Sequence, residues 1–594
     1  MSLITDRRDL DFNLIYLLDI ESLLSKQKYS SYDYETVSSI LDTAQKIAED
    51  ICLPCASEID KHEPQFVDGK AIAHPAIRKC LSAFAQAGFF AAGFDEDVGG
   101  MQIPMVVQTA ITGMFSCANL SVNNYSFLTI AAANLIKTFG SLEQKSIFLP
   151  RMLAGEWFGT MCLSEPQAGS SLSDIKTKAM LLHNQRYSIQ GSKMWISGGD
   201  QDISENIIHM VLARTPDAPA GVKGISLFIV PKYQIAENGG IGDSNNISLA
   251  GLNHKMGNRG TTNALLNFGE SGLCEGWLVG EENHGLRYMF QMMNEARIGV
   301  GHGAAMQGLA GYLYSLEYAR MRPQGRSPEQ KDPSSPQVSI IQHADVKRLL
   351  LAQKSAVEGA LSLSFYCACL IDEIETSEDE QTAVDKSMLL DLLTPIAKSW
   401  PSEFCLEANK HAIQILGGYG YTTEYPVERM YRDNRLNHIH EGTHAIHGLD
   451  VLGRKVRLCD GKALSLLAAE VEATLNLAKA NDEFLAEAAQ LEKALMGLVD
   501  VTSRLIDNED ISKVLANATL YLDTIGHIVI GWLWLKKAIL AAALLKSDTG
   551  DAFLVGKITC MRYFYRYELA KVAQYFELLG RLDTTFLYMD DAQF

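Results

Sequence analysis

The stretch HIHEGTH, residues 438–444, decides how this chain is interpreted, because its glutamate supports two incompatible chemistries. As His440-Glu441-x-x-His444 it matches the signature of zinc proteases, in which two histidines one helical turn apart bind the metal. As Glu441-Gly442-Thr443 it is a carboxylate base followed by a glycine that lets other atoms approach the backbone. The zinc interpretation needs a stable helix, yet glycine and threonine are poor helix formers. We favour the base and keep a zinc hydrolase as an alternative.

Composition limits the class of protein. The chain has 594 residues, of which 47% are hydrophobic and 21% charged, which is ordinary for a globular protein with several domains. A net charge of −19 argues against a nucleic-acid partner. The longest apolar stretch, residues 525–545, contains His527, Lys536 and Lys537, so we expect a buried or amphipathic helix and no stable membrane insertion. Irregularly spaced cysteines and no apolar signal segment predict a reducing cytoplasm.

Hydrophobic periodicity changes twice along the chain, and these changes help to predict its domains. Helical spacing of apolar residues gives way to short alternating runs separated by Gly, Pro, Asn and Asp, and then returns. This order excludes an alternating βαβ fold, and no Gly-x-Gly-x-x-Gly follows a predicted strand. We expect an α+β multi-domain protein. Its predicted parts are an N-terminal extension (1–33), an N-terminal helical domain (34–156), a middle β domain (157–283), a C-terminal helical bundle that carries Glu441 (284–458) and an additional helical domain (459–594).

Four separated segments have to be explained together. They are LSEPQAGS (163–170), KMWIS (193–197), QILGGYG (414–420) and HIHEGTH (438–444). In this order and at these distances they resemble the acyl-CoA dehydrogenase family, over roughly residues 35–456. The resemblance implies a central domain that is β-barrel-like, FAD as cofactor and an acyl-CoA thioester as substrate.

The chemistry of that family gives Glu441 a role. Desaturation of a thioester between its α and β carbons needs a base for the α proton and an acceptor for the β hydride. The resemblance makes Glu441 the base and N5 of FAD the acceptor, with a trans-2-enoyl-CoA as product. A carboxylate in a dry pocket has a raised pKa, which suits a base. Gly442 would let the backbone approach the substrate carbonyl, whose developing charge the amide of Glu441 would stabilise.

The other site residues are also implied by the resemblance. Leu163 and Ser164 would face the flavin ring, Gly169 and Ser170 its pyrophosphate and the thioester, Trp195 and Ser197 its other side, and Thr443 would add a further contact with FAD. Arg322, Gln324, Gln414 and Gly418 would reach the FAD of a neighbouring subunit, because the family's FAD site is shared. A homo-oligomer follows from this arrangement.

The substrate would be held by Ser170, Asn294, Arg297 and His440. Some family members carry the base immediately before the arginine, where this chain has Ala296. Glu295 is adjacent but points about 100° away on a helix, which leaves Glu441 as the base. His440 departs from the tyrosine that is common before the base. It either titrates near neutral pH or fills the space of that ring.

The segments around residues 9–24 and 459–594 exceed the minimal family unit. They resemble a larger bacterial branch that includes enzymes for long-chain acyl-CoAs and for 3-methylthiopropanoyl-CoA, in which the extra domain covers a tetramer surface. We therefore expect a dimer, with an electron-transferring flavoprotein as electron acceptor. An acyl-CoA oxidase that uses oxygen is the main alternative. A binding protein without activity is less consistent with Glu441, and the sequence does not define the acyl chain.

Overall fold

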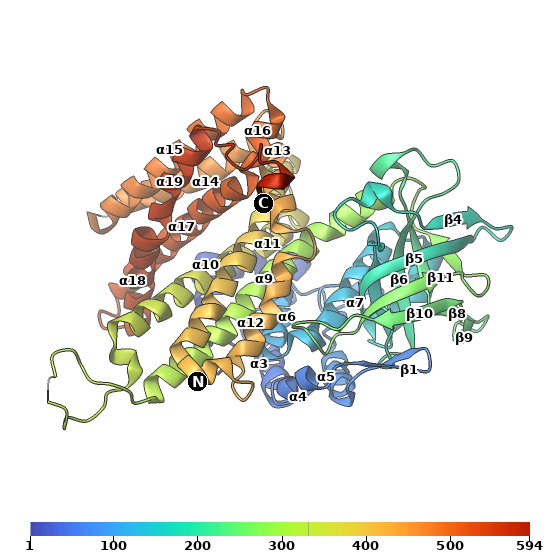
Figure 1. Cartoon of the computed structure of the whole chain (residues 1–594), viewed down its shortest axis with the longest axis horizontal. Helices are drawn as coiled ribbons and strands as arrows, with labels where there is room; N and C mark the ends of the chain where they lie inside the picture. The colour runs from blue at the N-terminus through green and yellow to red at the C-terminus, as the bar shows by residue number, and fades with distance from the viewer. Residues whose placement is uncertain (1, 331, 481) are drawn as a thin grey trace. The chain divides into compact units, whose positions relative to one another are not determined.

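The computed structural model describes residues 2–330, 332–480 and 482–594. The chain forms two compact units (Figure 1). One unit contains Glu35–Ala296, and the other combines Met1–Tyr34 with Arg297–Phe594. We call them the mixed unit and the helical unit, and describe each by itself.

The mixed unit begins with helices whose ends are fixed by capping groups. His74 accepts a hydrogen bond from the amide of Ala76 at the start of α5, and Ser141 and Gln144 form a reciprocal capping box at the start of α8. Its helices are α3 (Tyr34–Ile47), α4 (Ala56–Lys61), α5 (Pro75–Gln86), α6 (Met105–Ala118), α7 (Leu120–Phe139) and α8 (Leu142–Leu153). Helix α7 packs against the sheet, where the hydroxyl of Thr129 accepts from the amide of Gly159 at 3.0 Å.

An eight-stranded sheet and two two-stranded sheets, β1-β2 and β8-β9, lie in the rest of the mixed unit. The order of the eight-stranded sheet is β10-β11-β5-β12-β7-β6-β3, with β4 also paired to β5. Only β3 and β6 run parallel among the pairs of this sheet that the structure describes. The strands are β1 (Gln65–Val67), β2 (Lys70–Ile72), β3 (Trp157–Cys162), β4 (Lys178–Leu181), β5 (Tyr187–Ser197), β6 (Asn206–Ala213), β7 (Ser226–Pro231), β8 (Tyr233–Ile235), β9 (Ile241–Ser244), β10 (Ile247–Leu252), β11 (Asn263–Phe268) and β12 (Glu275–Leu278). Every residue of β6 and β7 is buried, as expected for central strands with continuous apolar runs.

The helical unit contains long helices that pack side by side, such as α10 and α11 (Figure 1). Its helices are α1 (Arg7–Asp11), α2 (Ile20–Leu24), α9 (Gly285–Met321, which begins in the mixed unit), α10 (Ala344–Glu375), α11 (Glu380–Leu416), α12 (Val427–Arg435), α13 (His444–Gly453), α14 (Lys462–Lys479), α15 (Leu485–Ile506), α16 (Ile511–Ala516), α17 (Ala518–Leu545), α18 (Ala552–Tyr567) and α19 (Val572–Gly580). Helices α9 and α11 approach so closely that a Cβ on Gly301 would lie 1.8 Å from the carbonyl oxygen of Ala397. The glycines of α9 therefore serve helix packing.

In the part of this unit that the structure describes, two helices are long and apolar enough to cross a membrane by length and composition. They are α10 and α17, and 89% and 67% of their most apolar windows are buried inside the protein. The core helix of a folded domain passes the same test. Lys537, in the apolar stretch that the sequence singles out, is buried in α17.

A buried ionic network joins the N-terminal segment to other helices of the helical unit. The carboxylate of Asp9 accepts hydrogen bonds from Lys537 of α17 and Lys557 of α18, and Lys557 also contacts Glu358 of α10 at 2.6 Å. These lysines hold the pKa of Asp9 below its usual range, against the opposing effect of burial. Because buried charges need partners, Asp9 fixes this segment in place.

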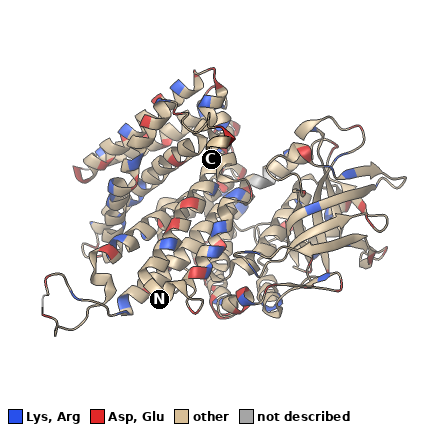
Figure 2. Cartoon of the chain, viewed as in Figure 1, with Lys and Arg blue, Asp and Glu red and all other residues tan. Residues whose placement is uncertain are grey.

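The order of helices, strands and helices confirms the α+β expectation. Acidic and basic residues are interspersed along the helices of both units (Figure 2), in keeping with a solvated acidic surface.

Candidate active site

The HIHEGTH stretch forms a strained loop before a helix. A short 3₁₀ turn ends at His438, and α13 begins at His444. Between them, Glu441 has φ of 53° and Gly442 has φ of 90°. A left-handed glutamate costs free energy, and such strain persists where the surroundings hold it in place. A Cβ on Gly442 would lie 2.8 Å from Nε2 of His447, so both the φ angle and this contact require glycine.

Two side chains from different helices hold the carbonyls of this loop. His447 of α13 lies 3.0 Å from the carbonyl oxygen of Glu441 through Nε2, and Lys398 of α11 donates from Nζ to the carbonyl oxygen of Gly442 at 2.7 Å. Among the described residues, no group accepts a hydrogen bond from the amide N–H of Glu441 or of Gly442. The loop therefore keeps these two donors available for a ligand.

The carboxyl of Glu441 has the electrostatics of a base. Burial raises its pKa, and the positive charges of Arg297 and Lys398 oppose this effect. Arg297 is 5% exposed and lies 3.8 Å from Asp450 of α13. Burial lowers the pKa of Lys398 to about 7, although the charge of Glu441 favours its protonated form. A carboxyl with raised pKa beside cations suits proton transfer near neutral pH.

His440 does not behave as a group that titrates near neutral pH. Burial, together with the charge of Lys398, lowers its pKa to about 3. Its Nε2 lies 3.0 Å from Oδ1 of Asn437, so the neutral ring donates to this amide oxygen. Of the two interpretations of His440, the structure favours a ring that fills space.

We expect His440 to remain neutral between about pH 5 and pH 8, because its surroundings disfavour the charged imidazolium. Nuclear magnetic resonance of isotope-labelled histidine, with His440→Asn for assignment, should reveal no titration of this ring in that range. An inflection near pH 6.5, the ordinary value, would contradict the expectation.

The structure does not place the two histidines of the zinc signature as a zinc site requires. His440 lies before the start of α13, so the two histidines of the signature are not on adjacent turns of one helix. The Nε2 atoms already have other partners, Asn437 for His440 and Asp523 for His444, the latter at 3.1 Å. The ring of His444 instead stacks on that of His438, at 4.6 Å between centroids.

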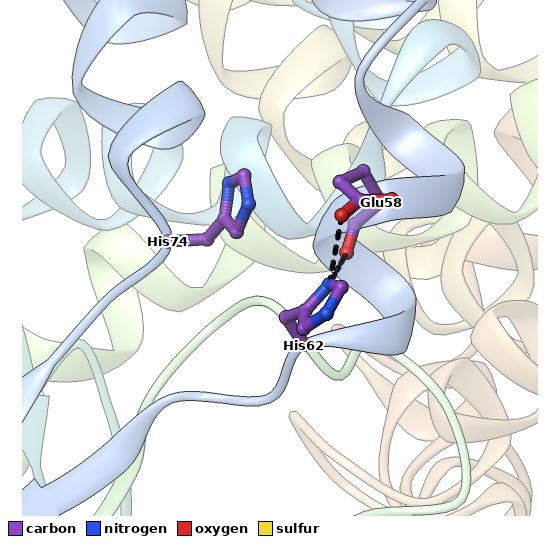
Figure 3. Close-up of side chains that lie close together, drawn as sticks. All are labelled: Glu58, His62 and His74. Carbon is purple, nitrogen blue, oxygen red and sulfur yellow. Dashed lines mark hydrogen bonds and ion pairs between the residues drawn. The ribbon is translucent and has the colours of Figure 1, made fainter.

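A different cluster, in the mixed unit, has metal-binding residue types. Glu58, His62 and His74 place one ligand atom each within 4.8 Å of one another (Figure 3). Nδ1 of His74 accepts from the amide of Ala76, however, which places the ring proton on Nε2 in the neutral tautomer. His62 and Glu58 already pair at 3.1 Å on an exposed surface. The cluster is accounted for by capping and pairing.

The loop after β3 contains four of the candidate flavin contacts, Leu163, Ser164, Gly169 and Ser170. Glu165 is buried there and accepts from Lys193 at 2.9 Å, from the hydroxyl of Thr177 at 2.6 Å and from the amide of Lys176 at 2.7 Å. Lys193 also donates to the carbonyl oxygen of Leu163 at 3.0 Å. Although burial alone would raise it, Lys193 and Thr177 hold the pKa of Glu165 at about 2. These bonds fix the loop of residues 163–170.

Two hydroxyls and one glycine of this loop are candidates for contact with a ligand. The hydroxyls of Ser164 and Ser170 make no hydrogen bond within the described chain, and a Cβ on Gly169 would meet open space. A rigid loop with unused donors and an uncovered glycine suits phosphate and ring-edge contacts.

Trp195 lies on a β-bulge. Met194 and Trp195 of β5 together face the single residue Leu265 of β11, and Trp195 has φ of 66°. A bulge redirects the side chain of the extra residue, and this indole is 60% exposed. Ser197 follows, with its hydroxyl 3.3 Å from Nδ2 of Asn263. An exposed, rigidly held indole fits the face of a flat cofactor ring.

The four residues expected to serve a neighbouring subunit lie on the surface of the helical unit. They are Arg322, Gln324, Gln414 and Gly418, and all are exposed. The guanidinium of Arg322 lies over the ring of Tyr419, 5.3 Å from its centroid, which brings the loop after α9 next to the turn after α11. Their exposure leaves them available to another molecule.

Asn294 and Arg297 lie one turn apart on α9. Glu295 accepts a hydrogen bond from Asn134 of α7 at 3.3 Å. This contact is consistent with a structural role for Glu295.

Four residues that the structure makes functional candidates could not be assigned a role from the sequence. They are Lys398, His447, Glu165 and Lys193. One signal was available for Lys398, which stands alone in the apolar helical run LLTPIAKSW, residues 392–400. A lysine at a core position of such a pattern needs a partner.

The chain matches four family models in sequence. They are described as "Acyl-CoA dehydrogenase, N-terminal domain" over residues 35–156, "Acyl-CoA dehydrogenase, middle domain" over 160–270, "Acyl-CoA dehydrogenase, C-terminal domain" over 283–456 and "Acetyl-CoA dehydrogenase C-terminal like" over 467–590.

Relatives extend along nearly the whole chain. It is 33% identical to the 3-methylmercaptopropionyl-CoA dehydrogenase of Ruegeria pomeroyi, with 95% of each protein covered. It is also 33% identical to the broad-specificity linear acyl-CoA dehydrogenase FadE5 of Mycobacterium tuberculosis, with 99% of each covered. A crystal structure of an acyl-CoA dehydrogenase complexed with FAD from Bacillus anthracis superposes with a TM-score of 0.75 at 20% identity, covering 97% of this chain and 93% of that one, which supports the fold.

Proposed function

Because this chain belongs to the acyl-CoA dehydrogenase family, we propose that it converts an acyl-CoA thioester to the trans-2-enoyl-CoA with Glu441 as the base. The observation that carries this proposal is the loop of Glu441 and Gly442. It combines a carboxyl of raised pKa with two unused amide donors.

In this proposal the amide of Glu441 donates to the thioester carbonyl oxygen, which makes the α proton more acidic and stabilises the charge that develops on that oxygen. The carboxylate of Glu441 then takes the α proton. Arg297, buried nearby and paired with Asp450, favours the ionised carboxylate before the reaction. FAD, when bound, supplies the acceptor for the β hydride.

The residues fit this cofactor. Ser164, Gly169, Ser170 and the exposed ring of Trp195 provide hydroxyls, open backbone and an apolar face, with Leu163 and Ser197 beside them. Thr443 caps α13 by accepting from the amide of Ile446, and its hydroxyl proton remains available for a further contact. Ser170, Asn294, Arg297 and His440 complete the proposed substrate contacts.

The surface set of Arg322, Gln324, Gln414 and Gly418 supports a homo-oligomer in which each FAD is shared. We propose a dimer, because the chain carries the additional helical domain, and an electron-transferring flavoprotein as electron acceptor. The names of the relatives, one for a sulfur-containing acyl group and one for linear chains, define the range of substrates to test.

The function is tested by anaerobic titration of the FAD-bound enzyme with acyl-CoAs from short to long, including 3-methylthiopropanoyl-CoA. We expect bleaching of the flavin and formation of the enoyl-CoA by at least one of them. No bleaching with any acyl-CoA would overturn the proposal. Rapid reoxidation of the reduced enzyme by oxygen, without an added flavoprotein, would favour the acyl-CoA oxidase.

A further inference from the structure

Lys398 is a buried cation whose hydrogen bond goes to the backbone of the base loop. Its side chain is inaccessible to solvent, and its ammonium donates to the carbonyl oxygen of Gly442 at 2.7 Å. A buried lysine of purely structural function would be expected to pair with a carboxylate, as Lys557 does with Asp9 and Glu358. Lys398 instead has its charge near the carboxyl of Glu441 while its hydrogen bond holds the next residue.

The carbonyl of Gly442 matters because a peptide group is rigid. Fixing the carbonyls of two successive residues fixes the planes of the peptides that follow them, and the strained φ angles of Glu441 and Gly442 need such restraint. His447 holds the carbonyl of Glu441 and Lys398 that of Gly442. The carbonyl of Glu441 shares its peptide plane with the amide of Gly442, so the His447 bond orients this unused donor. The Lys398 bond fixes the next peptide, between Gly442 and Thr443, and so restrains the strained backbone after the base.

Charged and titratable groups from three other elements act with Lys398. The loop contributes Glu441 and His440, α9 contributes Arg297, and α13 contributes His447. Asp450 on α13 and Asp391 on α11 act on Arg297. Burial lowers the pKa of both histidines, so they are neutral, and the carboxyl of Glu441 therefore interacts mainly with two cations, Arg297 and Lys398.

We propose that Lys398 is a positioning residue of the reaction, whose ammonium holds the Gly442 carbonyl and whose charge favours the ionised carboxylate of Glu441. This inference rests on the proposed function of Glu441 as the base. It assigns two separable effects to one side chain, a geometric effect through the hydrogen bond and an electrostatic effect through the charge.

The two effects predict different results for two substitutions. Lys398→Met keeps the length of the side chain and removes both the donor and the charge. Lys398→Gln keeps an N–H donor, on a side chain one atom shorter, and removes the charge. In both variants the acid limb of kcat/KM should move to higher pH by about 1 unit or more, because an opposite charge near a carboxyl lowers its pKa by 1–3 units. The kcat of Lys398→Met should fall about 10- to 100-fold, with part of this loss recovered in Lys398→Gln.

The experiment compares these variants with wild type and with Lys410→Met, which removes an exposed lysine of the same helix. Each enzyme is loaded with FAD, and its flavin content and thermal unfolding are measured before the pH profile. Hydrogen exchange of the peptide that contains residues 439–446 gives a second readout. We expect faster exchange in Lys398→Met than in wild type and no change in Lys410→Met.

The outcomes separate this inference from the proposed function. If wild type bleaches with no acyl-CoA, the proposed function fails. If wild type is active and both Lys398 variants retain its pH profile and its exchange rates, the inference alone fails. Loss of FAD or of thermal stability with an unshifted acid limb in the variants would also overturn it, since that is the result of a structural role. If Lys398→Met does not fold, Lys398→Gln still decides the electrostatic effect.

Discussion

Glu441→Gln should lower kcat for flavin reduction by about 10²–10⁴-fold or more while FAD remains bound, because the amide has the shape of the carboxylate but cannot accept the α proton. His447 and Lys398 bond to the main-chain carbonyls of Glu441 and Gly442 and not to the Glu441 side chain, so the loop should keep its conformation. Rapid mixing of the FAD-bound variant with the best acyl-CoA, followed by flavin absorbance, measures the effect directly. The Kd for the acyl-CoA should change by less than about tenfold, since the loss affects the transition state.

Glu295→Gln is the matched control for this substitution. Glu295 is the carboxylate next to the position that carries the base in some relatives, and it accepts from Asn134. We expect its kcat to stay within a few-fold of wild type. If Glu295→Gln abolishes flavin reduction and Glu441→Gln does not, the base has been assigned to the wrong glutamate.

The sequence predicted the identity of the candidate base but not the backbone conformation of the loop that carries it. Glu441 stands out because the ordered motifs resemble a family with known chemistry. The same letters also match a zinc signature, and only the backbone separates the two interpretations. The left-handed φ angles of Glu441 and Gly442 place the start of α13 at His444 and prevent a helix from including both histidines.

Buried cations explain most of what the sequence did not reveal. The local sequence gives no sign that Lys193 is buried, and for Lys398 the only sign is its apolar helical run. The contacts of these two lysines lie 28 and 44 residues away. Local patterns do not reveal which distant oxygen a lysine reaches. The same holds for Asp9, whose partner Lys557 is 548 residues further along the chain. For this reason the N-terminal extension was recognised as an addition, but its attachment was not.

The exposure of Trp195 depends on another long-range feature, the register in which its strand pairs. The alternating pattern of β5 predicts a strand, and an isolated tryptophan in a strand is usually part of the core. One extra residue opposite Leu265 turns the indole outwards. A bulge depends on the pairing of β5 with β11, which are separated by more than 60 residues in the sequence, so it is decided by tertiary structure.

Glu165→Ala should be the most destabilising single substitution at the candidate flavin loop. It leaves Lys193 buried without its anion and removes the acceptor of the Lys176 amide and the Thr177 hydroxyl. Breaking a buried ion pair in this way costs about 3–5 kcal/mol. For a unit of this size we expect the unfolding temperature to fall by roughly 10 °C or more, with loss of bound FAD because the loop of residues 163–170 is no longer fixed. Scanning calorimetry and flavin content measure the two effects, and Glu156→Ala, which removes an exposed partner of Arg151, is the control.

The double variant Glu165→Leu with Lys193→Met distinguishes a lost charge pair from lost backbone contacts. An apolar pair of similar volume removes the unpaired charge, so it should recover part of the stability, but the amides of Lys176 and Thr177 remain without their acceptor.

The contribution of Glu165 to stability depends on pH with a defined sign. Because the pKa of Glu165 is depressed in the folded protein, its contribution is present above the unfolded value of 4.5 and is lost as the pH falls towards about 2. Wild type should therefore lose more stability than the double variant between about pH 5 and pH 3, and equal losses in the two proteins would show that the pair does not stabilise this loop.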